Sequence, residues 1–139
     1  MTLLNDAERH FLNEHRIGRL ATTGPAARPH VVPVGFRLNP DGQNISIGGH
    51  TLEGRGQERL YLRHLATNPR AALVVDDVQT TPTWAPRGVL VKGAVTIHEQ
   101  GGETLGPGFG PRWIEISLDW VSSWGVDTHS FQPASPRRA

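Results

Sequence analysis

Residues 28–36, R-P-H-V-V-P-V-G-F, have the pattern of a β-strand in which one row is apolar and the other is not typically polar. In a β-strand, alternate side chains point to opposite faces of the sheet, so the even-numbered positions here form an apolar row that suits a core. The other row contains Pro33, which has no N–H, and Gly35, which has no side chain. Such a row fits a main chain left bare for a flat ligand. It also fits an edge strand that its proline protects from aggregation, which is the simpler interpretation of these residues alone.

Residues 4–15 and 57–66 repeat hydrophobic side chains at the spacing of amphipathic helices. Asn5 or Asp6 can cap the first helix, and Asn68-Pro69 ends the second. The core faces are expected to hold Ala7, Phe11 and Leu12 in the first helix and Leu62 and Leu65 in the second, with His10 and His15 in solvent.

The other hydrophobic segments are short and alternating, and they predict strands near residues 17–22, 44–48, 71–75, 87–98 and 114–118. The continuous run 71–75 suits a strand buried on both faces. The turn signal N-P-D-G at 39–42 predicts a hairpin, and Gly93 leaves room for a bulge. Five to seven strands with two helices predict a mainly β fold with α additions, built as a small barrel. We expect one domain over residues 1–127 and a flexible tail over 128–139.

Composition and charge exclude several classes of function. The 139 residues suit one domain with a modest core, and 16 glycines with 11 prolines fit many turns. A net charge of +1 gives no electrostatic reason to expect nucleic acid or a membrane surface as partner. The absence of cysteine excludes disulfides, a thiolate nucleophile and a cysteine-based zinc site. Without a long apolar run or an export signal, a soluble cytoplasmic protein is expected.

No motif of a self-sufficient catalyst is present. The chain has no glycine-rich phosphate loop between a strand and a helix, and no Gly-x-Ser-x-Gly elbow. Asp76-Asp77 can be imagined as a metal-binding pair, but adjacent carboxylates at a strand end more often begin a solvated turn. We therefore predict no metal site and assign no catalytic residue.

Three arginines, Arg55, Arg59 and Arg63, recur at every fourth position. A helix that starts early enough would align their side chains, and guanidinium groups match phosphate oxygens well. The alternative is a solvated helix face paired with Glu53 and Glu58. From these residues alone, the solvated face is the simpler interpretation.

Two tryptophans, Trp84 and Trp124, lie beside proline or glycine in loop-like surroundings. An aromatic side chain there can stack on a flat ring. It can equally close the end of a barrel or form a subunit contact. A redox cofactor needs little more from a protein than binding and orientation, so the stacking role is compatible with cofactor chemistry.

The order of these segments resembles the pyridoxamine 5′-phosphate oxidase-like superfamily. Over residues 4–127, a helix precedes I-G-R-L-A-T-T-G-P-A-A-R-P-H-V-V-P-V-G-F and then I-S-I-G-G-H. A helix ending in N-P, then A-A-L-V-V-D-D, P-R-G-V-L-V-K-G and V-S-S-W-G-V follow. Within the superfamily, the chain is most similar to the small actinobacterial branch of deazaflavin (coenzyme F420)-dependent oxidoreductases.

The resemblance implies a six- to seven-stranded split β-barrel, the FMN-binding split barrel, in a homodimer with two flavin-type sites at its interface. The cofactor ring would lie on the main chain of residues 32–35, and segments 84–88 and 123–125 of the partner chain would close the site. Relatives carry a Ser-Lys-Lys-Tyr-Arg-Asp-like phosphate run where this chain has R-L-Y-L-R-H at 59–64, and only Arg63 matches it directly. The expected cofactor-binding residues are Val32, Pro33, Val34, Gly35, Gly49, His50, Arg55, Arg59, Arg63, Trp84, Arg87 and Trp124.

The function implied by the resemblance is hydride transfer between F420, or alternatively FMN, and a small unsaturated organic substrate. The alternatives are an FMN-dependent enzyme like pyridoxamine-phosphate oxidase, a non-catalytic flavin-, haem- or tetrapyrrole-binding protein, and a dimer that has lost its cofactor. A proton would come from solvent, His30 or His50. The sequence names neither the substrate nor the direction of the reaction.

Overall fold

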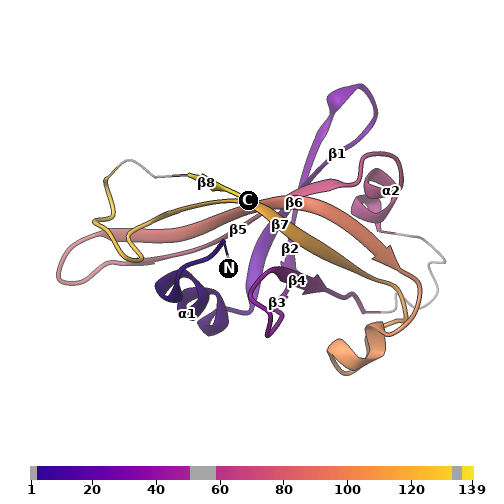
Figure 1. Cartoon of the computed structure of the whole chain (residues 1–139), viewed down its shortest axis with the longest axis horizontal. Coiled ribbons are helices and arrows are strands. Elements are labelled where there is room, and N and C mark those ends of the chain that lie inside the picture. The colour runs from indigo at the N-terminus through magenta and orange to yellow at the C-terminus, as the bar shows by residue number, and fades with distance from the viewer. Residues whose placement is uncertain (1–2, 51–58, 133–135) are drawn as a thin grey trace.

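A curved antiparallel sheet organises the part of the chain that the structure describes, residues 3–50, 59–132 and 136–139 (Figure 1). In this computed structural model the strand order is β2-β1-β5-β6-β7-β4-β3, and β8 pairs with β7. The helices are α1 (Asp6–Glu14) and α2 (Leu60–Thr67). The strands are β1 (Ile17–Thr23), β2 (Pro29–Gly35), β3 (Arg37–Leu38), β4 (Asn44–Ile47), β5 (Arg70–Gln79), β6 (Ala85–His98), β7 (Trp113–Trp124) and β8 (Arg137–Arg138). The predicted mainly β class with α additions is therefore confirmed, and the seven-stranded sheet curls into a half-barrel.

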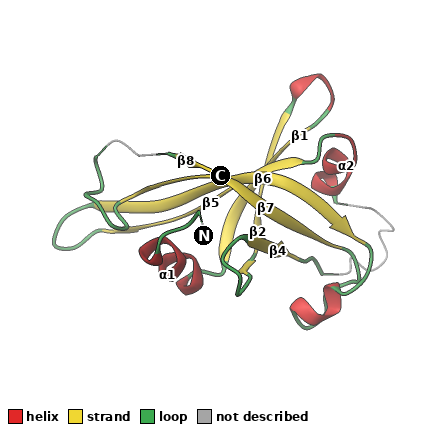
Figure 2. Ribbon diagram, in the orientation of Figure 1, coloured by secondary structure: helices red, strands yellow, loops and turns green. Residues whose placement is uncertain are grey.

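The long strands β5, β6 and β7 run side by side through the middle of the sheet (Figure 2). The helix α1 packs against β3 and β6, and α2 packs against β1 and β6. The hairpin between β5 and β6 extends to one end of the molecule, and α2 lies at the other end (Figure 1). Neither helix in the described residues is long and apolar enough to cross a membrane.

The core is built from one face of this sheet. A row of fully buried side chains crosses four neighbouring strands at matched register: Leu20, Leu73, Val91 and Val121. On β5 the residues between the buried ones, such as Val74, are half-buried. The prediction that residues 71–75 are buried on both faces is therefore wrong. The strand lies in an antiparallel sheet, where one face can stay open while the other is packed.

Local sequence signals gave the expected local structure. Asn5 caps α1 in a capping box, in which its side-chain oxygen accepts from the backbone N–H of Glu8 at 2.8 Å. Gly42 has a φ of 68° in the turn of the β3–β4 hairpin, a conformation that glycine adopts at little cost. The ladder between β6 and β7 shifts register between Lys92 and Gly93, which confirms the predicted bulge.

A buried carboxylate joins three elements that lie far apart in the sequence. Glu8 on α1 is fully buried, accepts a hydrogen bond from Ser123 Oγ of β7 at 2.5 Å, and pairs with Arg137 of β8. The sequence predicts a flexible tail over 128–139, yet its residues 137–138 pair with β7. The pairing follows from Glu8, because a buried carboxylate needs hydrogen-bond donors or an opposite charge.

The second helix begins later than the predicted range 57–66. It starts at Leu60, and Arg59 is the N-cap residue with an extended backbone. Arg55 lies outside the described residues. Of the predicted row of three arginines, only Arg63 therefore lies within a helix that the structure describes, with Arg59 at its entrance.

Candidate functional site

The strand β2 lies at one edge of the sheet and leaves one side of its main chain unpaired by another strand of the described chain. Val32 and Val34 pack against the core, whereas Pro33 and Gly35 on the opposite face are exposed. The structure thus places the predicted ring-binding stretch on an accessible edge.

The direction of the hydrogen bonds shows which main-chain groups are available. The N–H of Phe36 donates to the carbonyl of Arg16 at 3.2 Å, just past the end of β2. Because polar groups alternate in direction along an antiparallel pair, the N–H and carbonyl groups of residues 31, 33 and 35 point to the free edge. The missing N–H of Pro33 therefore costs the ladder no hydrogen bond. A Cβ atom added at Gly35 would meet only the carbonyl of Arg16, at 3.7 Å, so the space above this residue is open.

A cavity of about 440 Å³ adjoins the end of β2 and includes Gly35 in its wall. It lies between the end of α1, the junction of β2 and β3, the end of β4 and the turn around residues 105–109. Arg16, Arg37 and Phe109 line it, and the sequence did not identify any of them as functional residues. Their separation along the chain leaves no local pattern that would have revealed them.

The predicted residues Gly49, His50 and Arg59 lie together at the entrance to α2. The guanidinium of Arg59 donates to the carbonyl of His50 at 3.3 Å. A Cβ atom at Gly49 would lie 3.0 Å from Arg59 Nε, so glycine gives the arginine room to lie against the main chain. The His50 ring packs edge-on against Phe109 with centroids 4.6 Å apart, which connects this cluster to the cavity.

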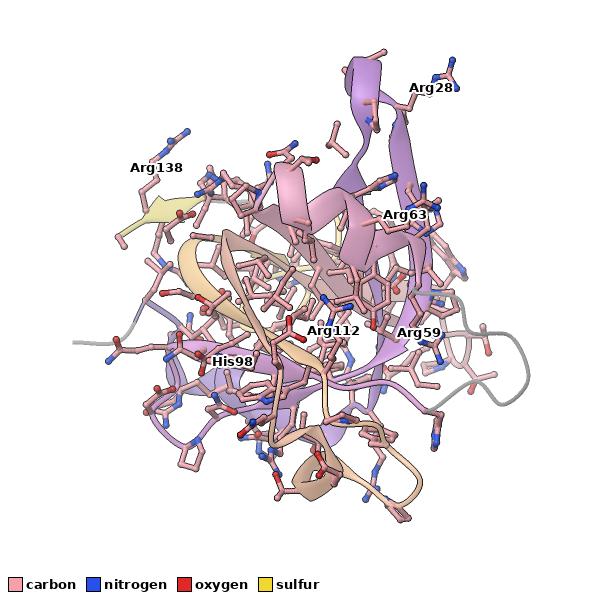
Figure 3. The ribbon with its side chains drawn as sticks, turned by 90° about the vertical axis from the view of Figure 1, so that its right-hand side faces the viewer. Arg28, Arg59, Arg63, His98, Arg112 and Arg138 are labelled. Atoms are coloured by element: carbon pink, nitrogen blue, oxygen red, sulfur yellow. The ribbon has the colours of Figure 1, made fainter. Side chains whose placement is uncertain are left out.

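Arg63 is one helical turn further along α2 and is exposed. Among the residues that the structure describes, no carboxylate lies within ion-pair distance of it. Figure 3 shows Arg59 and Arg63 on the same side of the molecule, beside the β1–β2 hairpin. Two guanidinium groups therefore lie on the side of the molecule that carries the β1–β2 hairpin, and guanidinium groups suit an anionic ligand.

The tryptophans do not join this cluster within one chain. Trp84 belongs to the β5–β6 connection, at the opposite end of the molecule from α2 (Figure 1). Its side chain is 60% exposed and stacks on Phe131 with ring centroids 5.8 Å apart. Trp124 packs over Gly88, where a Cβ atom would lie 2.4 Å from its ring. Both tryptophans therefore belong to a different end of the sheet from Arg59 and Arg63.

Arg87, another predicted cofactor ligand, is engaged in an ion pair. Its Nε and Nη2 donate to the Asp77 carboxylate at 2.7 and 2.9 Å, and its guanidinium lies 4.9 Å from the centre of the Phe11 ring. The hydrogen bond from Arg87 holds the pKa of Asp77 below its usual value; burial opposes this shift, and a hydrogen bond from His15 adds to it. Arg87 therefore fastens β5 to β6 near α1 rather than extending toward β2.

His15 is not solvated as predicted. Its Nε2 lies 2.9 Å from Asp77, its Nδ1 lies 2.7 Å from the carbonyl of Phe11, and its ring stacks on that phenylalanine. His30, a candidate proton donor, packs edge-on against His64, whose Nδ1 lies 3.0 Å from Thr22 Oγ1. The contact of His15 with Asp77 depends on a residue distant in sequence, so the helical pattern of residues 4–15 contains no sign of it.

Comparison with known proteins agrees with this geometry. The family model described as pyridoxamine 5'-phosphate oxidase matches residues 4–125. A 5a,11a-dehydrotetracycline/5a,11a-dehydrooxytetracycline reductase from Streptomyces rimosus is 32% identical over 117 residues, which cover 84% of this chain and 80% of that protein.

Solved structures show the same fold. A conserved hypothetical protein from Mycobacterium tuberculosis has a TM-score of 0.68 at 20% identity, covering 91% of this chain and 88% of its own. A structure named F420 reductase has a TM-score of 0.64 at 24% identity, covering 86% of this chain and 98% of its own. The half-barrel is thus the split β-barrel that the resemblance implied, and the chain belongs to the pyridoxamine 5'-phosphate oxidase family.

Proposed function

We propose that this protein is a flavin-type oxidoreductase that uses the deazaflavin F420, with FMN as the alternative cofactor, to reduce an unsaturated organic substrate. The observation that carries the proposal is the bare free edge of β2 at Pro33 and Gly35, in a molecule that also places Arg59 and Arg63 on the side of the β1–β2 hairpin. The Streptomyces relative, named as a reductase of dehydrotetracyclines, supports the reaction class. The neighbour named F420 reductase supports the choice of cofactor.

The residues present fit a flat cofactor with an anionic tail. Main-chain groups of residues 31, 33 and 35 point to an open edge, where a heteroaromatic ring can exchange hydrogen bonds with them. Arg59 and Arg63 supply charge-assisted hydrogen bonds for a phosphate. When bound, a reduced deazaflavin supplies a hydride, which together with one proton reduces a carbon–carbon double bond as the cofactor is oxidised.

The same proposal includes a homodimer. The outward face of β1 and β2 carries two exposed apolar side chains, Ile17, 61% exposed, and Val31, 65% exposed. We assign this face to a second copy of the chain. Because Trp84 lies at the opposite end of its own chain from Arg63, it reaches a cofactor on β2 only in a partner molecule. Each site then takes its floor and its arginines from one chain and its closing tryptophan from the other.

A binding titration tests the assignment. The purified protein is titrated separately with FMN and with F420, and quenching of the ligand fluorescence is followed. We expect micromolar or tighter binding of F420 and weaker binding of FMN. Tight binding of FMN alone would make FMN the cofactor instead of F420. Binding of neither ligand would favour a dimer that has lost its cofactor.

Arg63→Ala is expected to weaken F420 binding by about 1.5–3 kcal/mol, the usual contribution of a hydrogen bond to a charged group. Arg28→Ala is the matched control, because Arg28 is also exposed but lies at the tip of the β1–β2 hairpin (Figure 3). The same titration measures both variants. An unchanged affinity in Arg63→Ala would remove this residue from the site.

A further inference from the structure

The cavity at the end of β2 has an unusual combination of apolar walls and uncompensated positive charge. Its apolar walls include Phe36, Leu105 and Phe109. Its basic residues are His15, Arg16 and Arg37, and no aspartate or glutamate lies among the described residues that line it. A volume of about 440 Å³ is within the range of sites for drug-sized ligands.

Neighbouring groups hold the His15 ring in this wall. Its two ring nitrogens face the carbonyl of Phe11 and the carboxylate of Asp77, at 2.7 and 2.9 Å. Asp77 is already paired with Arg87 and holds His15 from behind the cavity wall.

The two arginines of the cavity differ from His15, which contacts the Asp77 carboxylate. Within the described part of the chain, no carboxylate lies within ion-pair distance of Arg16 or Arg37. Arg16 follows α1, and Arg37 begins β3 opposite Ser46 of β4, so the two arginines that line the cavity come from separate elements. Guanidinium groups at an apolar cavity favour a ligand that is both anionic and ring-shaped.

We propose that this cavity binds the substrate, and that the substrate is a planar organic anion such as an aromatic carboxylate, a phenolate or an enolate. Its ring packs among Phe36, Leu105 and Phe109, and its charge meets Arg16 and Arg37. The inference rests on the proposed function in one respect: Gly35 belongs both to the cavity wall and to the edge on which the cofactor ring lies. A substrate in the cavity therefore adjoins the redox ring, and neutral compounds of the same shape bind more weakly.

A pair of fluorescent dyes tests the charge preference without any cofactor. The anion 8-anilinonaphthalene-1-sulfonate and the neutral N-phenyl-1-naphthylamine share their rings and differ in the sulfonate. Each is titrated into the full chain at low salt, where exposed charges are least screened. We expect Arg37→Gln and Arg16→Gln each to raise the dissociation constant of the anion about tenfold or more and to leave the neutral dye unchanged.

Arg28→Gln, which removes an exposed arginine at the hairpin tip, is expected to leave both dyes unaffected. An unchanged affinity of the anion in both cavity variants, or an equal loss for the neutral dye, would overturn the proposal. A thermal melt of each variant confirms that it is folded.

The anionic tail of the cofactor is the other possible occupant with this chemistry, and a second titration separates the two. If the cavity binds substrate, Arg37→Gln binds F420 as tightly as the unmodified protein does. An equal loss of F420 and anionic dye in Arg37→Gln would assign the cavity to the cofactor tail and overturn the substrate assignment. Failure of F420 to bind the unmodified protein, with the dye preference intact, would reject the proposed cofactor but leave the anion site standing.

Discussion

At the scale of single residues, two positions on β2 define the floor of the candidate site. Pro33 lacks an N–H that would otherwise point to solvent, and Gly35 leaves its main chain uncovered. Both features are tolerated because the ladder with β1 uses the alternate residues of the strand. The edge strand can therefore be protected from aggregation and available to a ligand at the same time.

Gly35→Val is expected to abolish F420 binding while the fold is retained. Valine suits a strand, and the backbone there has space for a Cβ atom, but its branched side chain would cover the main chain that holds the ring. Fluorescence titration measures the loss, which we expect to exceed about tenfold, and circular dichroism checks the fold. Gly35→Ala is the graded control and should lose much less. Normal binding by the valine variant would show that the ring does not lie on this strand.

Strand alternation made the exposure of Pro33 and Gly35 predictable, because it depends only on neighbouring residues. The same reasoning could not find Arg16, Arg37 or Phe109. Four segments far apart in sequence meet to form their cavity, and a single sequence does not state which segments meet. The sequence therefore predicted the exposed strand of the candidate site but not its enclosed part.

At the scale of elements, the start of α1 and the position of the β3–β4 turn followed from short-range chemistry, whereas the start of α2 did not. The cap at Asn5, the turn at 39–42 and the bulge at Gly93 each depend on a few adjacent residues. The burial of Glu8 could not be predicted from the sequence. Within α1, Glu8 is only an acidic residue in the first helical turn. Its donors come from β7 and β8.

Glu8→Ala is expected to destabilise the protein by about 3 kcal/mol, since it leaves Ser123 and Arg137 without their shared acceptor and removes half of the capping box. Arg137 is partly exposed, so we expect a loss at the lower end of the range for broken buried pairs. Urea unfolding at neutral pH measures the change.

Glu14→Ala on the same helix is the control. Glu14 is half-exposed and pairs with exposed His10, so this substitution should change the free energy of unfolding little. Equal effects of the two substitutions would contradict a structural role for the buried carboxylate.

At the scale of the whole molecule, the half-barrel separates the two groups of residues that the sequence assigned to one site. Arg59 and Arg63 lie near α2, whereas Trp84 lies on the β5–β6 hairpin at the other end (Figure 1). Their grouping came from the family resemblance, and spacing along the chain contained no information about it. Under the proposed homodimer, a second copy brings these ends together.

Ile17→Glu is expected to convert the proposed dimer to a monomer and to weaken F420 binding by more than about tenfold. A charge on the apolar face of β1 would have to be buried without a partner on association, which is costly. Sedimentation velocity reports the assembly, and the fluorescence titration reports the binding. Thr104→Glu adds the same charge on the exposed turn Gly102–Leu105 and serves as control. A variant at position 17 that remains dimeric would exclude this face as the interface.

The contact between Glu8 and Arg137 also has a consequence for how the protein is made. The two residues are 129 positions apart, so the ribosome produces the carboxylate long before the arginine that neutralises it. A nascent chain that has emerged only as far as β6 lacks Ser123 as well, and docking α1 at that stage would bury an unneutralised charge. Docking of α1 is therefore expected to wait for the synthesis of β7 and β8, whose donors to Glu8 follow it by more than a hundred residues.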